Sequence, residues 1–165
     1  MNRMGYACIN MQLSSQKPKI YTGRSMIKRT FKDKGIKYAS LRYFNAAGYD
    51  LQKRIKSLES NPQNLIPKVM EVASGRKKQV AVYGNDYNTK DGTGVRDYIH
   101  VNDLADAHIA TIGYLLKNQK DLTINLGTGI GYSVLEIVNA VSLISKKNIK
   151  YKIKKRRNGD PDIMV

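Results

Sequence analysis

The stretch RDYIHVNDLADAHIATIGYLLK (residues 96–117) contains the change from strand to helix that decides the fold class. Its first six residues, RDYIHV, are expected to form a short extended segment. From about Asn102 to Lys117 the chain has helical periodicity, and one face of that helix is expected to carry Leu104, His108, Ile112 and Leu115. The stretch therefore predicts a strand that leads directly into an amphipathic helix.

The same alternation extends outward in both directions along the chain. Strands are predicted over IKYASLRYFN (36–45), VAVYG (80–84) and LTINLG (122–127). Helices are predicted over 24–34, over 64–75, and after Ser133, where Glu136 three residues later indicates a capping box. Strands that alternate with amphipathic helices are typical of an α/β fold with a largely parallel sheet.

The overall composition is that of a soluble globular protein. Of 165 residues, 41% are hydrophobic and 25% charged, which excludes a disordered chain. No run approaches the length of about 20 apolar residues that a membrane-spanning helix needs. Cys8 is the single cysteine, which excludes an internal disulfide and a thiol-rich zinc site. We expect a reduced, cytoplasmic setting and no membrane partner.

The formal net charge of +16 is large for this length. Eight of the twelve residues in KKNIKYKIKKRR (146–157) are Lys or Arg. Ile149, Tyr151 and Ile153 alternate with lysines there, which indicates an extended segment with one apolar and one cationic face. Such a segment is either a solvated sheet edge or a surface that faces an anion. A nucleic-acid partner is disfavoured, because no aromatic stacking platform accompanies the lysines.

Both histidines and several aspartates gather in GVRDYIHVNDLADAH (94–108). Asp103 and Asp106 fall in the first turn of the predicted helix, where carboxylates complement the helix dipole and can cap free N–H groups. His108 shares a face with apolar residues, so we expect it to be packed and hydrogen-bonded. Because no pair of histidines has helical zinc spacing, we predict no metal site.

Three further segments have two interpretations on local grounds. Arg96 follows a Gly-Thr-Gly turn, where it can reach an anion or simply lie at the surface. RRNGDP (156–161) is either a diphosphate-binding corner or a solvated turn. NLGTGIGYS (125–133) lacks the third glycine of a dinucleotide fingerprint, since Tyr132 stands at that position, and a tight structural turn is favoured.

Five motifs in order resemble the second half of the UDP-glucose 4-epimerase family of extended short-chain dehydrogenases. They are LRYFNAAG (41–48), NLIP (64–67), VYGNDY with DGTGVRDYIHVNDLADAH (82–108), NLGTGIGYSVLEIVNA (125–140) and RRNGDP (156–161). The resemblance implies a Rossmann domain for NAD and a smaller substrate-binding domain. In that family a tyrosine takes the proton of the sugar 4-hydroxyl while NAD accepts the hydride from C4. The 4-keto sugar then turns over and receives the hydride on its other face.

Carried over motif by motif, the resemblance assigns roles to particular residues of this chain. Tyr21 is the catalytic tyrosine, and Tyr43 and Phe44 lie beside the nicotinamide of NAD. The residues expected to contact the UDP-sugar are Asn45, Asn64, Leu65, Tyr83 beside the uracil, Arg96 and Arg157 on the diphosphate, and Asp160 near the ribose.

The sequence departs from the family around Tyr21. The family places a lysine four residues after this tyrosine, and here that residue is Ser25, with Lys28 displaced three positions further along. A tyrosine without that cation keeps its proton near neutral pH and is a poor base. Residues 1–20 carry no glycine-rich NAD loop. We therefore expect a fragment of an epimerase, truncated at the N-terminus and before the final helices, that is inactive by itself.

The expected domain organisation follows from the same resemblance. Residues 1–20 are left unassigned and are a candidate for disorder, 21–48 form a remnant of the NAD-binding domain, and 49–165 form the substrate-binding part, with one returning Rossmann segment at about 92–112. The family forms homodimers through helices of the N-terminal half, one of them interrupted here, so the same dimer is not expected. A UDP-sugar-binding remnant without chemistry is the alternative function, ahead of a basic nucleic-acid-binding domain.

Overall fold

The computed structural model describes residues 6–12, 29–31, 34–55 and 59–165. The chain divides into two compact units, each built from two separate segments. The first unit comprises residues 1–51 and 99–127, and the second comprises 52–98 and 128–165. Tyr21 and the residues that follow it up to Lys28 lie outside the described ranges, as does most of the helix predicted over 24–34.

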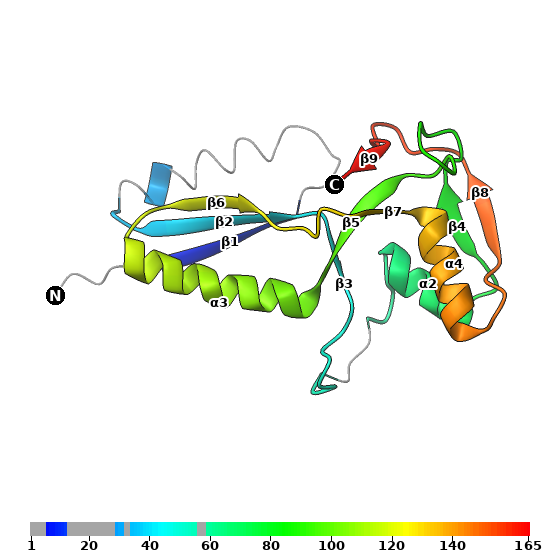
Figure 1. Ribbon diagram of the computed structural model, residues 1–165, viewed down its shortest axis with the longest axis horizontal. Helices are drawn as coiled ribbons and strands as arrows, with labels where there is room; N and C mark the ends of the chain where they lie inside the picture. Colours follow the sequence, from blue (N-terminus) through cyan, green and yellow to red (C-terminus); the bar gives the residue numbers. More distant parts are fainter. Residues whose placement is uncertain (1–5, 13–28, 32–33, 56–58) are drawn as a thin grey trace. The chain divides into compact units, whose positions relative to one another are not determined.

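The first unit contains a three-stranded parallel sheet in the order β1-β2-β6. Its strands are β1 (Tyr6–Gln12), β2 (Lys37–Tyr43) and β6 (Leu122–Asn125), and Figure 1 shows them side by side with a long helix along them. The register places Ala39 of β2 opposite Cys8 on one side and Leu122 on the other. The parallel sheet confirms the α/β class that the alternating pattern predicts.

β2 is the central strand because its residues are apolar enough to be covered on both sides. Ala39 and Leu41 are completely buried, as expected for a strand between two parallel neighbours. The strand predicted over 36–45 is confirmed. No element is predicted within residues 1–20, whereas Tyr6–Gln12 form β1. The short segment YACINMQ is ambiguous between strand and helix by its pattern alone. Its strand conformation follows from its pairing with β2 over seven residues.

The helix α3 (Val101–Asn118) contacts β1 and β2. His100 is its N-cap, with Nδ1 accepting a hydrogen bond from the Asn102 N–H at 3.1 Å, so the cap is an imidazole and not one of the aspartates. The buried face consists of Leu104, Thr111 and Leu115. Ile112, which the periodicity placed on that face, is 48% exposed, whereas its neighbour Thr111 is buried.

The second unit has its own apolar core between two helices and a pair of strands (Figure 1). The elements are α2 (Leu65–Ala73), β4 (Val80–Tyr83), α4 (Val134–Ser145) and β8 (Tyr151–Lys154). Ser133 and Glu136 form the predicted capping box at the start of α4. The core consists of Val69, Ala73, Val80, Val138 and Ile149, with Leu65, Val72 and Val141 packed against it.

Three short strands bring distant segments of the second unit together. β5 (Val95–His100) pairs antiparallel with β7 (Gly131–Ser133) and parallel with β9 (Ile163–Met164). Gly131 is required at this junction, since a Cβ there would lie 2.5 Å from Val95 Cγ1. The pairing fixes the C-terminal segment beside the start of β5, and this arrangement positions the candidate site.

The basic segment 146–157 forms a sheet edge. β8 pairs in parallel with β4, and all four residues of β8 are exposed. Ile149 is buried as predicted, but Tyr151 and Ile153 are 45% and 38% exposed. The predicted apolar face is therefore covered at one position and open at the other two.

In the part of the chain that the structure describes, no helix is long and apolar enough to cross a membrane.

Candidate functional site

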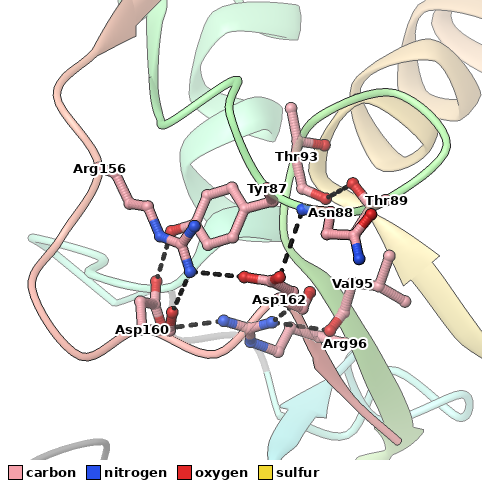
Figure 2. A network of polar contacts seen from close by, with 9 residues as sticks. All are labelled: Tyr87, Asn88, Thr89, Thr93, Val95, Arg96, Arg156, Asp160 and Asp162. Atoms are coloured by element: carbon pink, nitrogen blue, oxygen red, sulfur yellow. Dashed lines mark hydrogen bonds and ion pairs between the residues drawn. The ribbon is translucent and has the colours of Figure 1, made fainter.

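Two loops of the second unit meet in a network of polar contacts around Arg96 (Figure 2). One is the loop between β4 and β5, and the other is the C-terminal segment 156–162. The Arg96 side chain is mostly buried, with 13% of its surface exposed, and its Nη2 lies 2.8 Å from Asp160 Oδ1. Arg96 Nη1 donates to the carbonyl oxygen of Val95 at 2.7 Å and more weakly to that of Asp162 at 3.4 Å. The strand β5 thus presents its arginine directly to the C-terminal segment.

Asp160 joins two partners that are far apart in sequence. Its Oδ1 accepts from Arg96, and its Oδ2 accepts from the hydroxyl of Tyr87 at 3.2 Å. Both carboxylate oxygens therefore have fixed positions.

Arg156 covers the other side of this network. Its guanidinium lies 3.9 Å above the centre of the Tyr87 ring, in cation–π geometry. Its Nη2 donates to the backbone carbonyl of Asp160 at 2.9 Å and pairs with the Asp162 carboxylate. Asp162 Oδ2 in turn accepts from the Asn88 N–H at 3.3 Å, so the two loops are fastened at several points (Figure 2).

The chemical state of Tyr87 follows from these surroundings. Burial and the neighbouring Asp160 carboxylate raise the pKa of Tyr87 above its ordinary value, while Arg156 and Arg96 act in the opposite direction. The Tyr87 hydroxyl therefore keeps its proton near neutral pH and acts as a hydrogen-bond donor. Burial also raises the pKa of Tyr98, on the same strand as Arg96, to about 12.

A second arginine–aromatic pair lies at the end of β4. The guanidinium of Arg157 stacks 4.1 Å from the centre of the Tyr83 ring. Arg157 is exposed and lines a cavity of about 540 Å³. The cavity has strongly cationic walls and is lined by Gly84, Asn85, Asp86, Lys154, Lys155, Arg156, Arg157, Asn158 and Gly159. An arginine that stacks on a ring beside a basic cavity can contact both an aromatic base and a phosphate.

Asp97 closes the glycine-rich turn after β6. Its Oδ1 accepts from the Thr128 N–H at 3.1 Å and from Thr128 Oγ1 at 2.7 Å, and its Oδ2 accepts from the Gly129 N–H at 2.9 Å. Burial acts to raise the pKa of Asp97, but these hydrogen bonds outweigh burial and lower it. Because the backbone N–H groups of Thr128 and Gly129 already bind a carboxylate, the turn is structural, as its sequence favoured.

Asp91 holds the loop between β4 and β5 in a similar way. Its Oδ1 accepts from the Thr93 N–H at 2.9 Å and from Thr93 Oγ1 at 2.7 Å, and its Oδ2 accepts from the Ser133 hydroxyl. The loop is thereby attached to the start of α4, and Tyr87 within it is held in place.

The residues predicted for the site divide between the two units. Tyr43, Phe44 and Asn45 belong to the first unit, at the carboxyl end of β2 and the start of β3 (Asn45–Ala47). Tyr43 is buried against Ile99 and Leu104. Tyr21, the predicted catalytic tyrosine, lies outside the described residues.

The second unit contains the other six predicted residues. Arg96 contacts Asp160, and Tyr83 contacts Arg157. Asn64 is the N-cap residue of α2, but its side chain makes no capping hydrogen bond. Leu65 is half-buried and packs on the core of this unit. These positions do not test the assigned roles, which stay predictions.

Sequence reasoning missed three members of the network, namely Tyr87, Arg156 and Asp162. Tyr87 was placed in a turn-rich loop, where a tyrosine carries no local signal of burial. Arg156 and Asp162 do carry a signal, since the arginine is next to the predicted Arg157 and the aspartate follows Asp160 at a spacing of two. In an extended segment residues two apart share a face, so Asp162 can reach groups on the same side as Asp160.

In the described part of the chain, no three His, Cys, Asp or Glu side chains come together as ligands for a metal ion.

Comparison with known proteins gives a consistent result. The chain matches the NAD dependent epimerase/dehydratase family over residues 19–127. It is 43% identical over 132 residues to UDP-glucose 4-epimerase of Rhizobium meliloti, covering 80% of this chain and 40% of that protein. It is 51% identical over 121 residues to UDP-glucose 4-epimerase of Mus musculus, covering 73% of this chain and 35% of that protein. The chain thus spans about 40% or less of the length of these relatives.

Solved structures of epimerases have the same fold. UDP-glucose-4-epimerase from Stenotrophomonas maltophila, with bound NAD and formylated UDP-arabinopyranose, matches with a TM-score of 0.85 at 32% identity, over 96% of this chain and 54% of that one. UDP-glucose 4-epimerase from Bifidobacterium longum, in complex with NAD+ and UDP, matches with a TM-score of 0.78 at 41% identity, over 88% and 43%. The motifs, the parallel sheet and these matches agree, and the chain belongs to the NAD dependent epimerase/dehydratase family.

Proposed function

We propose that this chain carries the UDP-sugar-binding part of a UDP-glucose/UDP-galactose 4-epimerase, with the ligand held by residues of the second unit. The relatives named above are UDP-glucose 4-epimerases, and two of the solved structures contain UDP or a UDP-sugar. Because the chain spans only part of those proteins, the complete reaction is part of the proposal. The observation that carries it is the pairing of Arg96 with Asp160 beside the stacked Tyr83 and Arg157.

The chemistry of this arrangement suits a nucleoside diphosphate. Arg96 and Arg157 supply planar cations, which bind phosphate oxygens through paired N–H groups. Asp160 supplies carboxylate oxygens that can accept hydrogen bonds from ribose hydroxyls. The Tyr83 ring offers an aromatic face of the kind on which a base such as uracil stacks. Asn64, whose amide is not used for capping, and Leu65 then contact the sugar nucleotide from the start of α2.

For the first unit, we propose the nicotinamide side of an NAD site, and the role of Asn45 at a sugar nucleotide rests on the family resemblance alone. Phe44 and Asn45 follow β2 at the carboxyl ends of parallel strands, where ligands of open α/β sheets bind. Tyr43, which precedes them, is buried in the core of the first unit. Within the described residues, the glycine turn most like a phosphate loop is closed by Asp97. The residues present therefore suit the nicotinamide of NAD and not its pyrophosphate. When bound, NAD would accept the hydride from C4 of the sugar.

The proton transfer is assigned to Tyr21, whose position the structure does not describe. Ser25 stands where the family has its lysine, the cation that lowers the pKa of the catalytic tyrosine in that family. We therefore expect no interconversion of UDP-glucose and UDP-galactose by the purified chain with added NAD. A chain that binds UDP but shows no turnover is a non-catalytic UDP-sugar-binding protein, which is the alternative form of this proposal.

Calorimetric titration with UDP tests the binding part of the proposal. The parent chain should bind UDP, and Arg96→Ala or Arg157→Ala should weaken binding by at least roughly tenfold, because hydrogen bonds to charged groups contribute about 1.5–3 kcal/mol each. Lys78→Ala, at an exposed position of the second unit, removes the same charge and should leave the affinity within about twofold of the parent. No heat with the parent chain would refute the proposal.

The exposed lysines of β8 support one competing function, which is nucleic-acid binding. Titration of a fluorescent single-stranded 20-mer at several salt concentrations distinguishes the two. Binding that falls steeply with salt, together with no response to UDP, would favour the nucleic-acid function. Binding of UDP with no measurable binding of the 20-mer favours the epimerase assignment.

A further inference from the structure

Tyr87 and Arg156 have no role among the residues assigned above, yet they contact the residue that neutralises Arg96. We propose that Tyr87 and Arg156 are positioning residues for the UDP-sugar site, and that they act through Asp160 to keep part of the Arg96 guanidinium available for the diphosphate. This inference rests on the proposed function and deepens it. Figure 2 shows the four side chains and the bonds between them.

Arg96 uses only some of its N–H groups in contacts with the protein. A guanidinium carries five N–H groups, and three contacts to protein acceptors engage Arg96, at Val95, Asp160 and Asp162. The contact to Asp160 uses one carboxylate oxygen only, at 2.8 Å. Among the described residues, two of its N–H groups therefore have no protein acceptor and can serve phosphate oxygens. If Asp160 bound Arg96 through both oxygens, it would occupy a donor that a phosphate needs.

The Tyr87 hydroxyl prevents Asp160 from pairing with Arg96 through both carboxylate oxygens. Arginine and carboxylate groups commonly pair through two parallel hydrogen bonds. Here the Tyr87 hydroxyl holds the other oxygen of Asp160 at 3.2 Å, so the carboxylate is turned partly away from Arg96. Removal of this hydroxyl frees Asp160 to rotate towards Arg96. The arginine would then be more completely neutralised, and a diphosphate would have to displace a stronger partner.

Arg156 fixes Tyr87 and Asp160 together. Tyr87 is 5% exposed, and Arg156 stacks on the face of its ring at 3.9 Å. The same guanidinium donates to the Asp160 backbone carbonyl at 2.9 Å. Arg156 therefore sets the distance between the tyrosine hydroxyl and the carboxylate that it holds, and its loss should act in the same direction as loss of the hydroxyl.

The test is a double-mutant cycle measured by calorimetry with UDP on the full 165-residue chain. Tyr87→Phe keeps the ring for Arg156 and removes only the hydroxyl, and we expect UDP to bind about three- to tenfold more weakly. In the Asp160→Asn background the same change should alter the affinity by less than about twofold, because the negative charge that Tyr87 restrains is gone. Tyr151→Phe is the matched control, at an exposed tyrosine of β8, and should bind UDP as the parent does.

A second measurement uses the unliganded chain and does not depend on affinity. In 15N spectra the Arg96 Nε–H resonance, assigned by its absence in Arg96→Lys, should shift in Tyr87→Phe and in Arg156→Met but not in Tyr151→Phe. Urea unfolding midpoints of all variants show whether the second unit is equally folded. A role confined to stability would lower the midpoint and weaken UDP binding equally in both backgrounds.

The outcomes separate this inference from the proposed function. If the parent chain binds UDP while Tyr87→Phe binds equally well, or leaves the Arg96 resonance unmoved, the positioning role is refuted and the proposed function stands. Equal weakening by Tyr87→Phe in both backgrounds also refutes it. If the parent chain does not bind UDP, both fail together.

Discussion

Replacement of Asp97 by asparagine tests whether a buried carboxylate holds the turn after β6. Asp97 is 4% exposed and accepts hydrogen bonds from the Thr128 N–H, the Thr128 hydroxyl and the Gly129 N–H. Asparagine has nearly the same shape, but one of its two terminal groups is a donor. Either the Gly129 N–H or the pair of Thr128 donors would then face an NH2 group in place of an oxygen.

The expected cost follows from counting these groups. Hydrogen bonds to a charged acceptor contribute about 1.5–3 kcal/mol, and a buried donor left without an acceptor costs about 1–3 kcal/mol. One bond is lost outright in Asp97→Asn, and the others change from a charged to a neutral acceptor. The free energy of unfolding should therefore fall by about 2–4 kcal/mol, measured by urea denaturation followed by circular dichroism.

The pH dependence gives an independent check on the charge. The pKa of Asp97 is lower in the folded chain than its ordinary value of 3.8. Its ionisation therefore stabilises the fold fully above about pH 5, and this contribution is lost as the pH falls through 3.8 to the lower folded pKa. The Asp97→Asn variant has no such contribution to lose in acid. The free energies of unfolding of parent and variant should therefore converge as the pH is lowered.

The control is Asp103→Asn in the first turn of α3, where the aspartate is exposed. Its loss removes a favourable interaction with the helix dipole, which is about 0.3–1 kcal/mol. If Asp97→Asn costs no more than this control, or loses stability in acid as the parent does, Asp97 does not hold the turn through its charge.

Two other substitutions test the fold at single points. Gly48→Ala should destabilise the chain by at least about 2 kcal/mol, because φ is +90° and a Cβ would lie 2.3 Å from the His100 ring. Gly35→Ala is the comparison, since φ is +64° there with open space around it, and a similar loss in both would contradict the clash. Ser133→Ala removes the cap of α4 and the partner of Asp91, so the urea midpoint should fall by an amount equivalent to about 1–2 kcal/mol. A midpoint equal to that of the parent would show that the cap contributes nothing.

Local patterns were sufficient wherever a segment carries its own signal. The capping box at Ser133 and Glu136 needs only residues three apart, and it forms as predicted. β2 was recognised because IKYASLRYFN (36–45) is rich in β-branched and aromatic residues, which favour a buried strand. β1 was missed because its strand conformation depends on pairing with β2, about thirty residues away.

The helix α3 also shows that a local pattern does not determine which residues are buried. Periodicity identified the helix but placed Ile112 on the buried face, whereas Thr111 is buried and Ile112 is 48% exposed. Thr111 can be buried because its hydroxyl donates to the Ala107 carbonyl at 2.6 Å. Which residues at the edge of the apolar face are buried is decided by the surface against which the helix packs, and the helix sequence does not contain that information.

For the candidate site, the motifs were enough to predict which types of side chain are available. The motifs supplied Arg96, Arg157 and Asp160, and their resemblance to an epimerase family is confirmed by the matches to UDP-glucose 4-epimerases. The pairing of Arg96 with Asp160, 64 residues away, and the hydrogen bond from Tyr87 to that carboxylate are visible only in the folded chain. The physical reason is that a side chain's chemistry is local, whereas the charge and hydrogen bonds left for a ligand depend on which neighbours folding brings to it.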